Sequence, residues 1–516
     1  MSNEDLLFAY FAAVPLLPLA GGLLILALTE SSEEAAKIIS VASKTGAAAF
    51  SVIACRNLAF IAGGESLVRS FIWMETGGGE IHVVFGAAPQ SSQLLVLLTL
   101  IALCSIALYS LGNKLAPDGL SAKAIGVALL YEGGVYLSIL SANPVQAAVL
   151  LTSASMAGYA FIFLKCPSEE DAKGTNLLVI SGMAADYMII CGCAMLAKAF
   201  GGDATSTADE MIQRSFSAAD PGNSLAAGLV LAGTAIKTGF FPFCHLIFRR
   251  RLENTNIPDK TILFGSTAGA LSILGGIRPI ISMIPEAYLS AFTAAAAATG
   301  ISAGICAHMA KDLRKTSEAL AISMTALAAA AIVLNDSLGT DYIILTTAAS
   351  VAILTLVPNA IFGGIHSTEI EDVREGGING LTIIYVLCLV SAAGLPPLSG
   401  FGRSAAVVGG SSGLSSALVL AAIAATAFAC AGKSIDIITA WKGKKPESGR
   451  LTVRYAPIVC LAAAAFITEL NSAGFITGAP IPAGTAIMCA SPILTGAAAA
   501  LAARLMKRAG PERKVK

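Results

Sequence analysis

The chain has 516 residues, of which 55% are hydrophobic and only 13% are charged. A soluble domain of average composition carries about a quarter charged residues, so the composition argues against a water-soluble protein. The formal net charge is zero and gives no information about partners. Fifty glycines suit helix packing in lipid, because small residues let backbones approach closely. The sequence therefore predicts an all-α polytopic membrane protein.

A spanning helix needs about 20 consecutive, predominantly apolar residues. The first such stretch follows an acidic Asn-Glu-Asp sequence and is long, so we expect a spanning helix there rather than a cleaved signal peptide. In chain order the predicted spans are residues 6–29, 36–62, 91–111, 122–141, 144–165, 175–200, 224–248, 258–283, 286–308, 317–335, 340–363, 378–401, 411–440, 453–473 and 483–506.

The distribution of basic residues supports this set of spans. If the helices alternate in direction, one face receives most of the lysines and arginines, and the other receives little beyond Arg69, Arg214 and Arg278. The positive-inside rule then predicts a cell-membrane protein with its N-terminus outside and its C-terminus in the cytoplasm. The basic residues on the predicted cytoplasmic face, besides those of the tail after the last span, are Lys37, Lys114, Lys123, Lys165, Lys173, Arg249, Arg250, Arg251, Lys260, Lys311, Arg314, Lys315, Arg374, Lys442, Lys444, Lys445 and Arg450.

The segments between the spans carry few residues suited to catalysis. Residues 63–89 are glycine-rich, contain His82 and are expected to form the longest outside loop. Eleven cysteines lack paired metal-ligand spacing and are expected to be apolar filler with reduced thiols. We therefore expect no metal, no cofactor and no catalytic site in this chain, and no nucleic-acid partner.

Two predicted spans are interrupted by proline. Pro242 breaks the span at 224–248, and Pro396 and Pro397 break the span at 378–401. Unwound backbone at membrane depth is tolerated where it is buried in protein or lines a polar cavity. The two interrupted helices lie five spans apart and so run in opposite directions, as an inverted repeat requires. The predicted units are an N-terminal block at 1–121, five-helix repeats at 122–283 and 284–440, and C-terminal helices with a basic tail at 441–516.

Charged residues within the spans mark candidate functional sites, because a buried charge costs several kcal/mol. Lys237 lies near the middle of an otherwise uncharged run, five residues before Pro242. A functional role is favoured for Lys237, whereas Lys44 and Arg56 are expected to snorkel to the membrane surface. Lys433 and Asp436, three residues apart, either carry ions or neutralise one another. The candidate ion-translocating residues are Lys237, Glu132, Asp186, Arg403, Lys433 and Asp436.

Four motifs give the chain a specific resemblance. Residues 233–248 (GTAIKTGFFPFCHLIF), 311–323 (KDLRKTSEALAIS), 370–380 (IEDVREGGING) and 391–401 (SAAGLPPLSGF) occur in this order. Over about residues 85–475 the chain resembles the antiporter-like membrane subunits of complex I, energy-converting membrane-bound hydrogenases and Mrp-type sodium/proton antiporters. The resemblance implies a fourteen-helix core, a buried polar axis that carries ions, and partners that are other membrane subunits.

The resemblance carries over to the individual residues only in part. Lys237 matches the family's lysine on the seventh helix. The family's glutamate position on the fifth helix reads Thr152, and its lysine positions on the eighth and eleventh helices fall near Ala270 and Leu354. On the twelfth helix the charged position falls at or beside Arg403 and Ser404. Half of the family's proton path is therefore absent or displaced.

Two carboxylates are candidates to replace the missing glutamate. Glu132 and Thr152 each lie ten residues from the turn near Ala142, and so about 15 Å deep at about 1.5 Å per residue. Glu132 is therefore the favoured partner of Lys237, and Asp186 is its rival. A carboxylate lowers the cost of a buried ammonium, and its displacement would release a proton.

Three functions are compatible with the sequence. The favoured one is an H⁺- or Na⁺-translocating subunit, without catalysis of its own, in a redox-driven complex of the complex I or membrane-bound hydrogenase type. The second is a structural membrane-arm subunit with a degenerate proton path. The third is a subunit of an Mrp-type antiporter, driven by an ion gradient with no redox partner.

Overall fold

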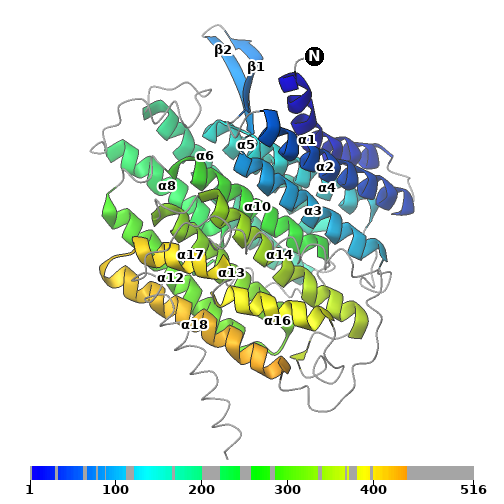
Figure 1. Ribbon diagram of the computed structural model, residues 1–516. Coiled ribbons are helices and arrows are strands. Elements are labelled where there is room, and N and C mark those ends of the chain that lie inside the picture. Colours follow the sequence, from blue (N-terminus) through cyan, green and yellow to red (C-terminus); the bar gives the residue numbers. More distant parts are fainter. Residues whose placement is uncertain are drawn as a thin grey trace, which may run out of the picture.

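The computed structural model describes residues 3–28, 33–61, 67–76, 79–87, 89–111, 121–164, 169–199, 221–243, 257–278, 285–334, 340–365, 369–370, 380–394 and 399–438. This part of the chain forms fourteen α-helices and one two-stranded sheet (Figure 1). The helices are α1 (Asn3–Ala27), α2 (Glu33–Ile61), α3 (Pro89–Leu111), α4 (Ala122–Ile139), α5 (Pro144–Leu164), α6 (Glu169–Ala199), α8 (Pro221–Lys237), α10 (Ile257–Gly276), α12 (Glu286–Met309), α13 (Leu313–Leu334), α14 (Thr340–Ile365), α16 (Gly380–Ala392), α17 (Ser399–Gly410) and α18 (Gly413–Ile438).

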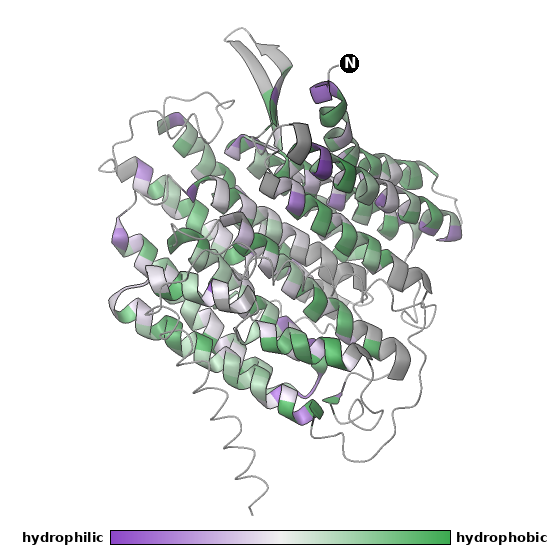
Figure 2. Ribbon diagram, in the orientation of Figure 1, coloured by the Kyte–Doolittle hydropathy of each residue, from purple (hydrophilic) through white to green (hydrophobic). Residues whose placement is uncertain are grey.

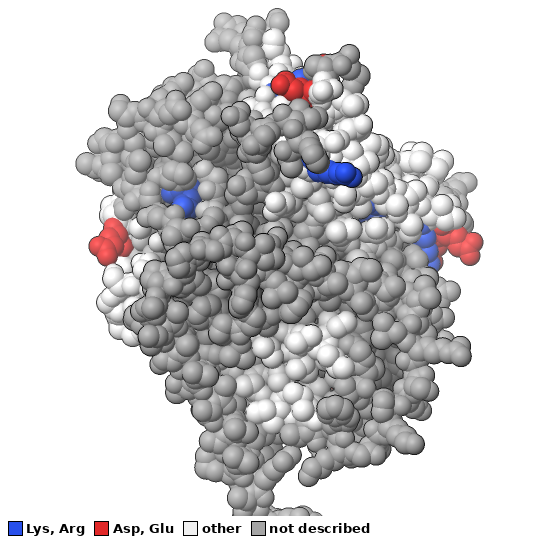
Figure 3. All heavy atoms as spheres, viewed as in Figure 1, with Lys and Arg blue, Asp and Glu red and all other residues white. Residues whose placement is uncertain are grey.

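The helices are those of a multi-pass membrane protein, as predicted. Within the described ranges, eight helices contain a stretch long and apolar enough to cross a membrane, and α3, α14 and α16 contain shorter apolar stretches. Figure 2 shows apolar residues along the lengths of the helices, and the face seen in Figure 3 carries few charged side chains among the described residues. The predicted spans at 453–473 and 483–506 lie outside the described residues.

The segment predicted as an outside loop is instead a β-hairpin. Strands β1 (Leu67–Thr76) and β2 (Gly79–Ala87) pair antiparallel and project beyond the helices beside the N-terminus (Figure 1). The physical reason lies in the sequence, since both segments are rich in β-branched and aromatic residues and a Gly-Gly-Gly run joins them. Arg69 of β1 forms an ion pair with Asp5 of α1 at 2.7 Å, which fixes the hairpin to the first helix.

Helix packing repeats between the two halves of the chain. In the first half α4 packs on α5 and α10, and α5 packs on α6; in the second half α12 packs on α13 and α18, and α13 packs on α14. The starts of α5 and α13 also match. Asn143 Oδ1 accepts a hydrogen bond from the backbone of Gln146, and Asp312 Oδ1 accepts one from the backbone of Arg314. Each side chain caps its helix, because it accepts from an otherwise unpaired N–H.

Helix α13 lies at the centre of the bundle. Of the eight candidate spans, its apolar window is the most completely enclosed, with 89% of its residues buried. It packs against α12, α14 and α17 of its own half and against α8 and α10 of the other half. Side chains on α13 therefore face both halves of the protein.

Candidate functional site

Helix α8 ends at Lys237, before the proline that was expected to break it. The N–H of Phe240 donates to Ala235 O at 2.8 Å, and the N–H of Gly239 donates to Ile236 O at 3.1 Å. This bond pair, with Gly239 at φ +78°, is a Schellman cap, which needs a residue that tolerates a left-handed conformation. Pro242 follows three residues after Gly239. The glycine therefore ends the helix, three residues before the proline.

Helix α16 ends in the same way. Its last residue is Ala392, and Gly394 has φ +78° and donates its N–H to Ser391 O at 2.9 Å. Helix α17 begins at Ser399, so the predicted interruption of this span is present. Pro396 and Pro397 lie outside the described residues.

The Lys237 ammonium lies in a buried cluster of polar side chains from three helices. It forms an ion pair with Asp186 Oδ1 of α6 and donates a hydrogen bond to Ser155 Oγ of α5 at 2.6 Å. The Tyr159 hydroxyl donates to the second oxygen, Asp186 Oδ2, at 3.3 Å. The side chains of Lys237 and Asp186 are only 3% and 1% exposed, so each charge depends on the other for compensation.

Close packing of α6 on α8 holds the ion pair together. A Cβ atom added at Gly233 of α8 would lie 2.7 Å from the backbone oxygen of Ala185, next to Asp186. A Cβ added at Gly192 of α6 would lie 2.6 Å from the backbone oxygen of Ala226. Both positions require glycine because the backbones touch there. This contact brings the short aspartate side chain within reach of the lysine.

The favoured pairing of Glu132 with Lys237 is wrong, and the rival Asp186 makes this contact. Glu132 instead accepts a hydrogen bond from Lys44 of α2 at 2.7 Å, and both side chains are buried. The snorkelling expected of Lys44 is therefore also wrong. Equal depth along two helices says nothing about which way each helix faces, and α4 turns Glu132 toward α2.

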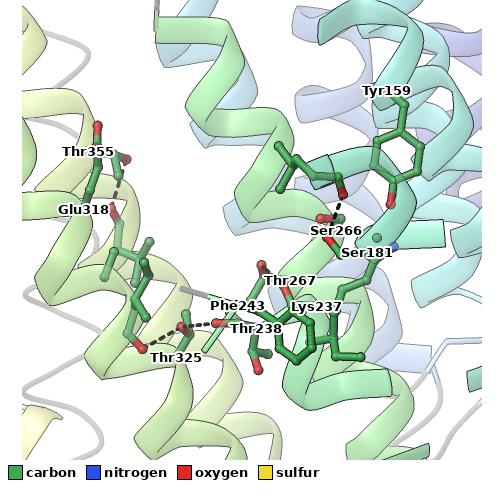
Figure 4. A pocket seen from close by; sticks show the side chains of 16 residues that line it. Tyr159, Ser181, Lys237, Thr238, Phe243, Ser266, Thr267, Glu318, Thr325 and Thr355 are labelled. Carbon is green, nitrogen blue, oxygen red and sulfur yellow. Dashed lines mark hydrogen bonds between the residues drawn. The ribbon is translucent and has the colours of Figure 1, made fainter. Parts of the chain in front are cut away.

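A cavity of about 140 Å³ begins at Lys237 and reaches the second half of the protein (Figure 4). Tyr159 and Ser181 lie at one end in this view, and Glu318 and Thr355 at the other. Between them Thr325 Oγ1 of α13 donates to the backbone oxygen of Thr238 at 3.4 Å. The cavity has room for several water molecules, and its mostly apolar lining includes hydroxyl groups such as those of Ser181 and Thr267.

The remaining predicted residues lie on α17 and α18. Lys433 is 5% exposed, and its ammonium donates to the backbone oxygen of Ala310 at the end of α12. Asp436 is half-buried on the following turn of α18. Arg403 of α17 is 2% exposed and is the largest of the most deeply buried side chains. The lysine and the arginine thus place two buried cations in the second half.

Several polar residues of the site escaped the sequence analysis. Ser155 and Tyr159 lie four residues apart on α5, and so on one face of that helix. Glu318 lies inside one of the motifs of the resemblance, on the central helix α13, about two turns before Thr325. Their four-residue spacing on α5 was therefore the sequence signal that could have identified Ser155 and Tyr159.

At the other positions where the resemblance led us to expect charges, the side chains are uncharged and are either hydrogen-bonded or buried. Thr152 Oγ1 donates to the backbone oxygen of Ala148 at 2.9 Å. Ala270 and Leu354 are fully buried in the apolar core. Within the described residues, no three histidine, cysteine or acidic side chains gather into a metal-binding group.

Fold and site together define a helical, multi-pass membrane protein with a buried lysine–aspartate pair at the end of a helix. No protein-family profile and no curated protein matches the sequence. Solved structures do match it. They include a chain of respiratory complex I from Thermus thermophilus (TM-score 0.73, 15% identity, covering 94% of this chain and 99% of that one).

Two further structures extend the comparison. A chain of the membrane-bound sulfane sulfur reductase, an archaeal respiratory membrane complex, gives a TM-score of 0.72 at 14% identity, covering 95% of this chain and 99% of that one. A chain of the Mrp complex from Dietzia sp. DQ12-45-1b gives 0.65 at 17% identity, covering 98% and 96%. The protein therefore shares the fold of these chains from membrane complexes over almost its whole length.

Proposed function

We propose that this chain is an ion-translocating, antiporter-like subunit of a redox-driven multisubunit membrane complex. The observation that carries the proposal is the buried Lys237–Asp186 pair at the end of α8, beside a cavity large enough to hold water. Buried ionisable residues in a membrane-spanning bundle are costly and typically mark ion or proton pathways. Irregular backbone at that depth fits a polar cavity.

The proposed ion is the proton. An ammonium that already neutralises Asp186 repels Na⁺, and the described part of the cluster offers one carboxylate rather than a cage of oxygen ligands. A proton needs only a donor and an acceptor. Separation of the pair would leave a buried ammonium without compensation and favour release of its proton into the cavity.

The proposed driving force is a redox reaction in neighbouring subunits, and this chain would hold no cofactor. Of the three similar structures described above, two are respiratory complexes by their titles and one is an Mrp complex. The proposed partners are further membrane subunits, in a cell membrane, with the N-terminus outside. Hydrogenase-like or quinone-oxidoreductase genes beside this one would favour the redox complex, and small antiporter genes would favour an Mrp-type assembly.

The test is proton pumping by the intact complex in sealed vesicles, with Lys237→Ala compared with wild type at equal assembly. Lys198→Ala is the matched control, because Lys198 is an exposed lysine on α6. The proposal predicts loss of pumping for Lys237→Ala alone. Pumping at the wild-type rate in that variant would refute it.

A second candidate function, a structural subunit with an incomplete path, is favoured by one observation. When the two glycine caps are aligned, the position of Lys237 corresponds to Ala392 in the second half. That half therefore lacks a lysine at its own interrupted helix. The same vesicle assay distinguishes the two candidates, since a structural subunit would tolerate Lys237→Ala.

A further inference from the structure

A second buried ion pair lies outside the Lys237 cluster. Lys44 of α2 and Glu132 of α4 are 88 positions apart in sequence, and their side chains are only 6% and 8% exposed. Lys44 Nζ donates to Glu132 Oε1 at 2.7 Å. Removal of two charges from water costs several kcal/mol per ion, which a single contact between them does not fully offset.

The pair leaves polar atoms available inside the protein. Glu132 Oε2 is buried and has no hydrogen-bond partner within the described residues, and the same holds for Ser40 Oγ. Ser40 lies four residues before Lys44, so both side chains are on one face of α2. A buried carboxylate oxygen without a partner is expensive, which indicates that it binds a proton or a water molecule.

Hydroxyl groups continue from this pair along α2. Ser51 Oγ lies 2.9 Å from Thr99 Oγ1 of α3, and Ser92 Oγ donates to Cys55 Sγ at 3.4 Å. From residue 40 to residue 55 this row covers roughly 22 Å of the helix at about 1.5 Å per residue. Polar groups therefore follow one face of α2 for much of the thickness of a membrane.

Tyrosines complete the surroundings of Glu132. Tyr136, one turn further along α4, and the adjacent Tyr131 lie within electrostatic reach of its carboxylate. Tyr131 also hydrogen-bonds Ser266 of α10, and its hydroxyl would lie 2.7 Å from a Cβ added at Gly265. Helix α4 thus presents Glu132 to α2 and Tyr131 to α10. Among the described groups, Lys44, Tyr131 and Tyr136 are titratable side chains close to Glu132.

We propose that Lys44 and Glu132 form a second proton-exchange site, in which Glu132 takes up and releases a proton at Oε2. In the uptake step a hydronium ion gives one proton to Oε2, an O–H bond forms, and a neutral water molecule remains. The carboxylate charge is lost, and Lys44 keeps its own proton and charge. Release reverses each step. Na⁺ is disfavoured, because the Lys44 ammonium occupies the position that a cation would need.

The test is infrared difference spectroscopy of the purified, intact complex after acidification. A protonated carboxylic acid has a carbonyl band that a carboxylate lacks, and this band shifts in D₂O. Because other carboxylates are also protonated, the proposal predicts one component of this band in wild type that is missing from the difference spectrum of Glu132→Gln. In Lys44→Met, which keeps Glu132 but removes the ammonium, the band should already be present at neutral pH.

The comparison of wild type with Glu132→Gln decides whether Glu132 exchanges a proton. Identical difference spectra for wild type and Glu132→Gln would mean that the pair is permanently charged, and would overturn the proposal. If Glu132→Gln fails to assemble, Lys44→Met combined with Glu132→Met replaces the whole pair by apolar side chains, which is often neutral for stability. The same band should then be missing from that variant. This measurement detects protonation of Glu132 and not transport, so its result remains valid even if the pumping assay refutes the proposed function.

Discussion

Gly239 and Gly394 occupy equivalent positions just after the ends of α8 and α16. Both have φ +78°, and both donate their N–H to the carbonyl three residues earlier. With these glycines aligned, Pro242 corresponds to Pro397. Both halves thus end a helix at a glycine with a left-handed conformation, but only the first half has a lysine, Lys237, on the last helical turn before that glycine.

Substitution of Asp186 should remove the counter-charge of Lys237. We expect Asp186→Asn to abolish pumping and to destabilise the assembled chain by about 3–5 kcal/mol, since a buried ammonium would lose its partner. Vesicle pumping and thermal unfolding of the complex measure these effects. Glu286→Gln, which alters an exposed carboxylate at the start of α12, should leave both unchanged. Normal pumping by Asp186→Asn would count against the pair.

Ser155 should contribute through its hydrogen bond to the ammonium. Loss of a bond of 2.6 Å to a charged group in Ser155→Ala should cost about 2 kcal/mol. Ser153→Ala is the matched control on the same helix, because Ser153 is exposed and bonds only its own helix backbone at Val149. Equal unfolding temperatures of the two variants would contradict the assignment.

The glycine at the end of α8 should be sensitive to any side chain. An L-residue at φ +78° is strained by roughly 1–2 kcal/mol, so Gly239→Ala should lower stability and shift the end of the helix that carries Lys237. Gly276→Ala is the control, since a Cβ there meets nothing within 4 Å. Thermal unfolding of both variants checks this, and a neutral Gly239→Ala would exclude strain at the cap.

Contact between α6 and α8 should be needed for the ion pair. Gly233→Ala would force the backbones apart, because its Cβ would lie 2.7 Å from Ala185 O. We expect reduced stability and reduced pumping together. Gly228→Ala, on the same helix, brings its Cβ only to an ordinary contact of 3.6 Å with Tyr288 and should be tolerated. Equal pumping by the two variants would show that this packing does not position the pair.

Hydropathy predicted the helices well because lipid requires long apolar segments with satisfied backbones. It placed residues 67–87 outside the helices but could not reveal the hairpin there, because strand pairing depends on β-forming residues and turn chemistry rather than on hydropathy. The end of α8 was attributed to Pro242, although Gly239 carried the stronger signal for a helix C-terminus.

The sequence alone predicted the buried lysine of the site, Lys237, but did not decide which carboxylate pairs with it. A single lysine in an apolar run identifies a buried charge from the sequence alone. The choice between Glu132 and Asp186 depends on the rotation of α4 and α6 about their own axes, which packing at glycines such as Gly233 decides. For the same reason the sequence did not reveal that Lys44 is paired.

The most direct test of the central claim is pumping by a variant in which both members of the pair are neutral. Lys237→Gln combined with Asp186→Asn keeps side chains of similar size that still form hydrogen bonds, so the complex should assemble. The account predicts that redox turnover in sealed vesicles continues while proton pumping through this subunit is lost. Wild-type pumping by the assembled double variant would contradict it and leave this chain a structural role.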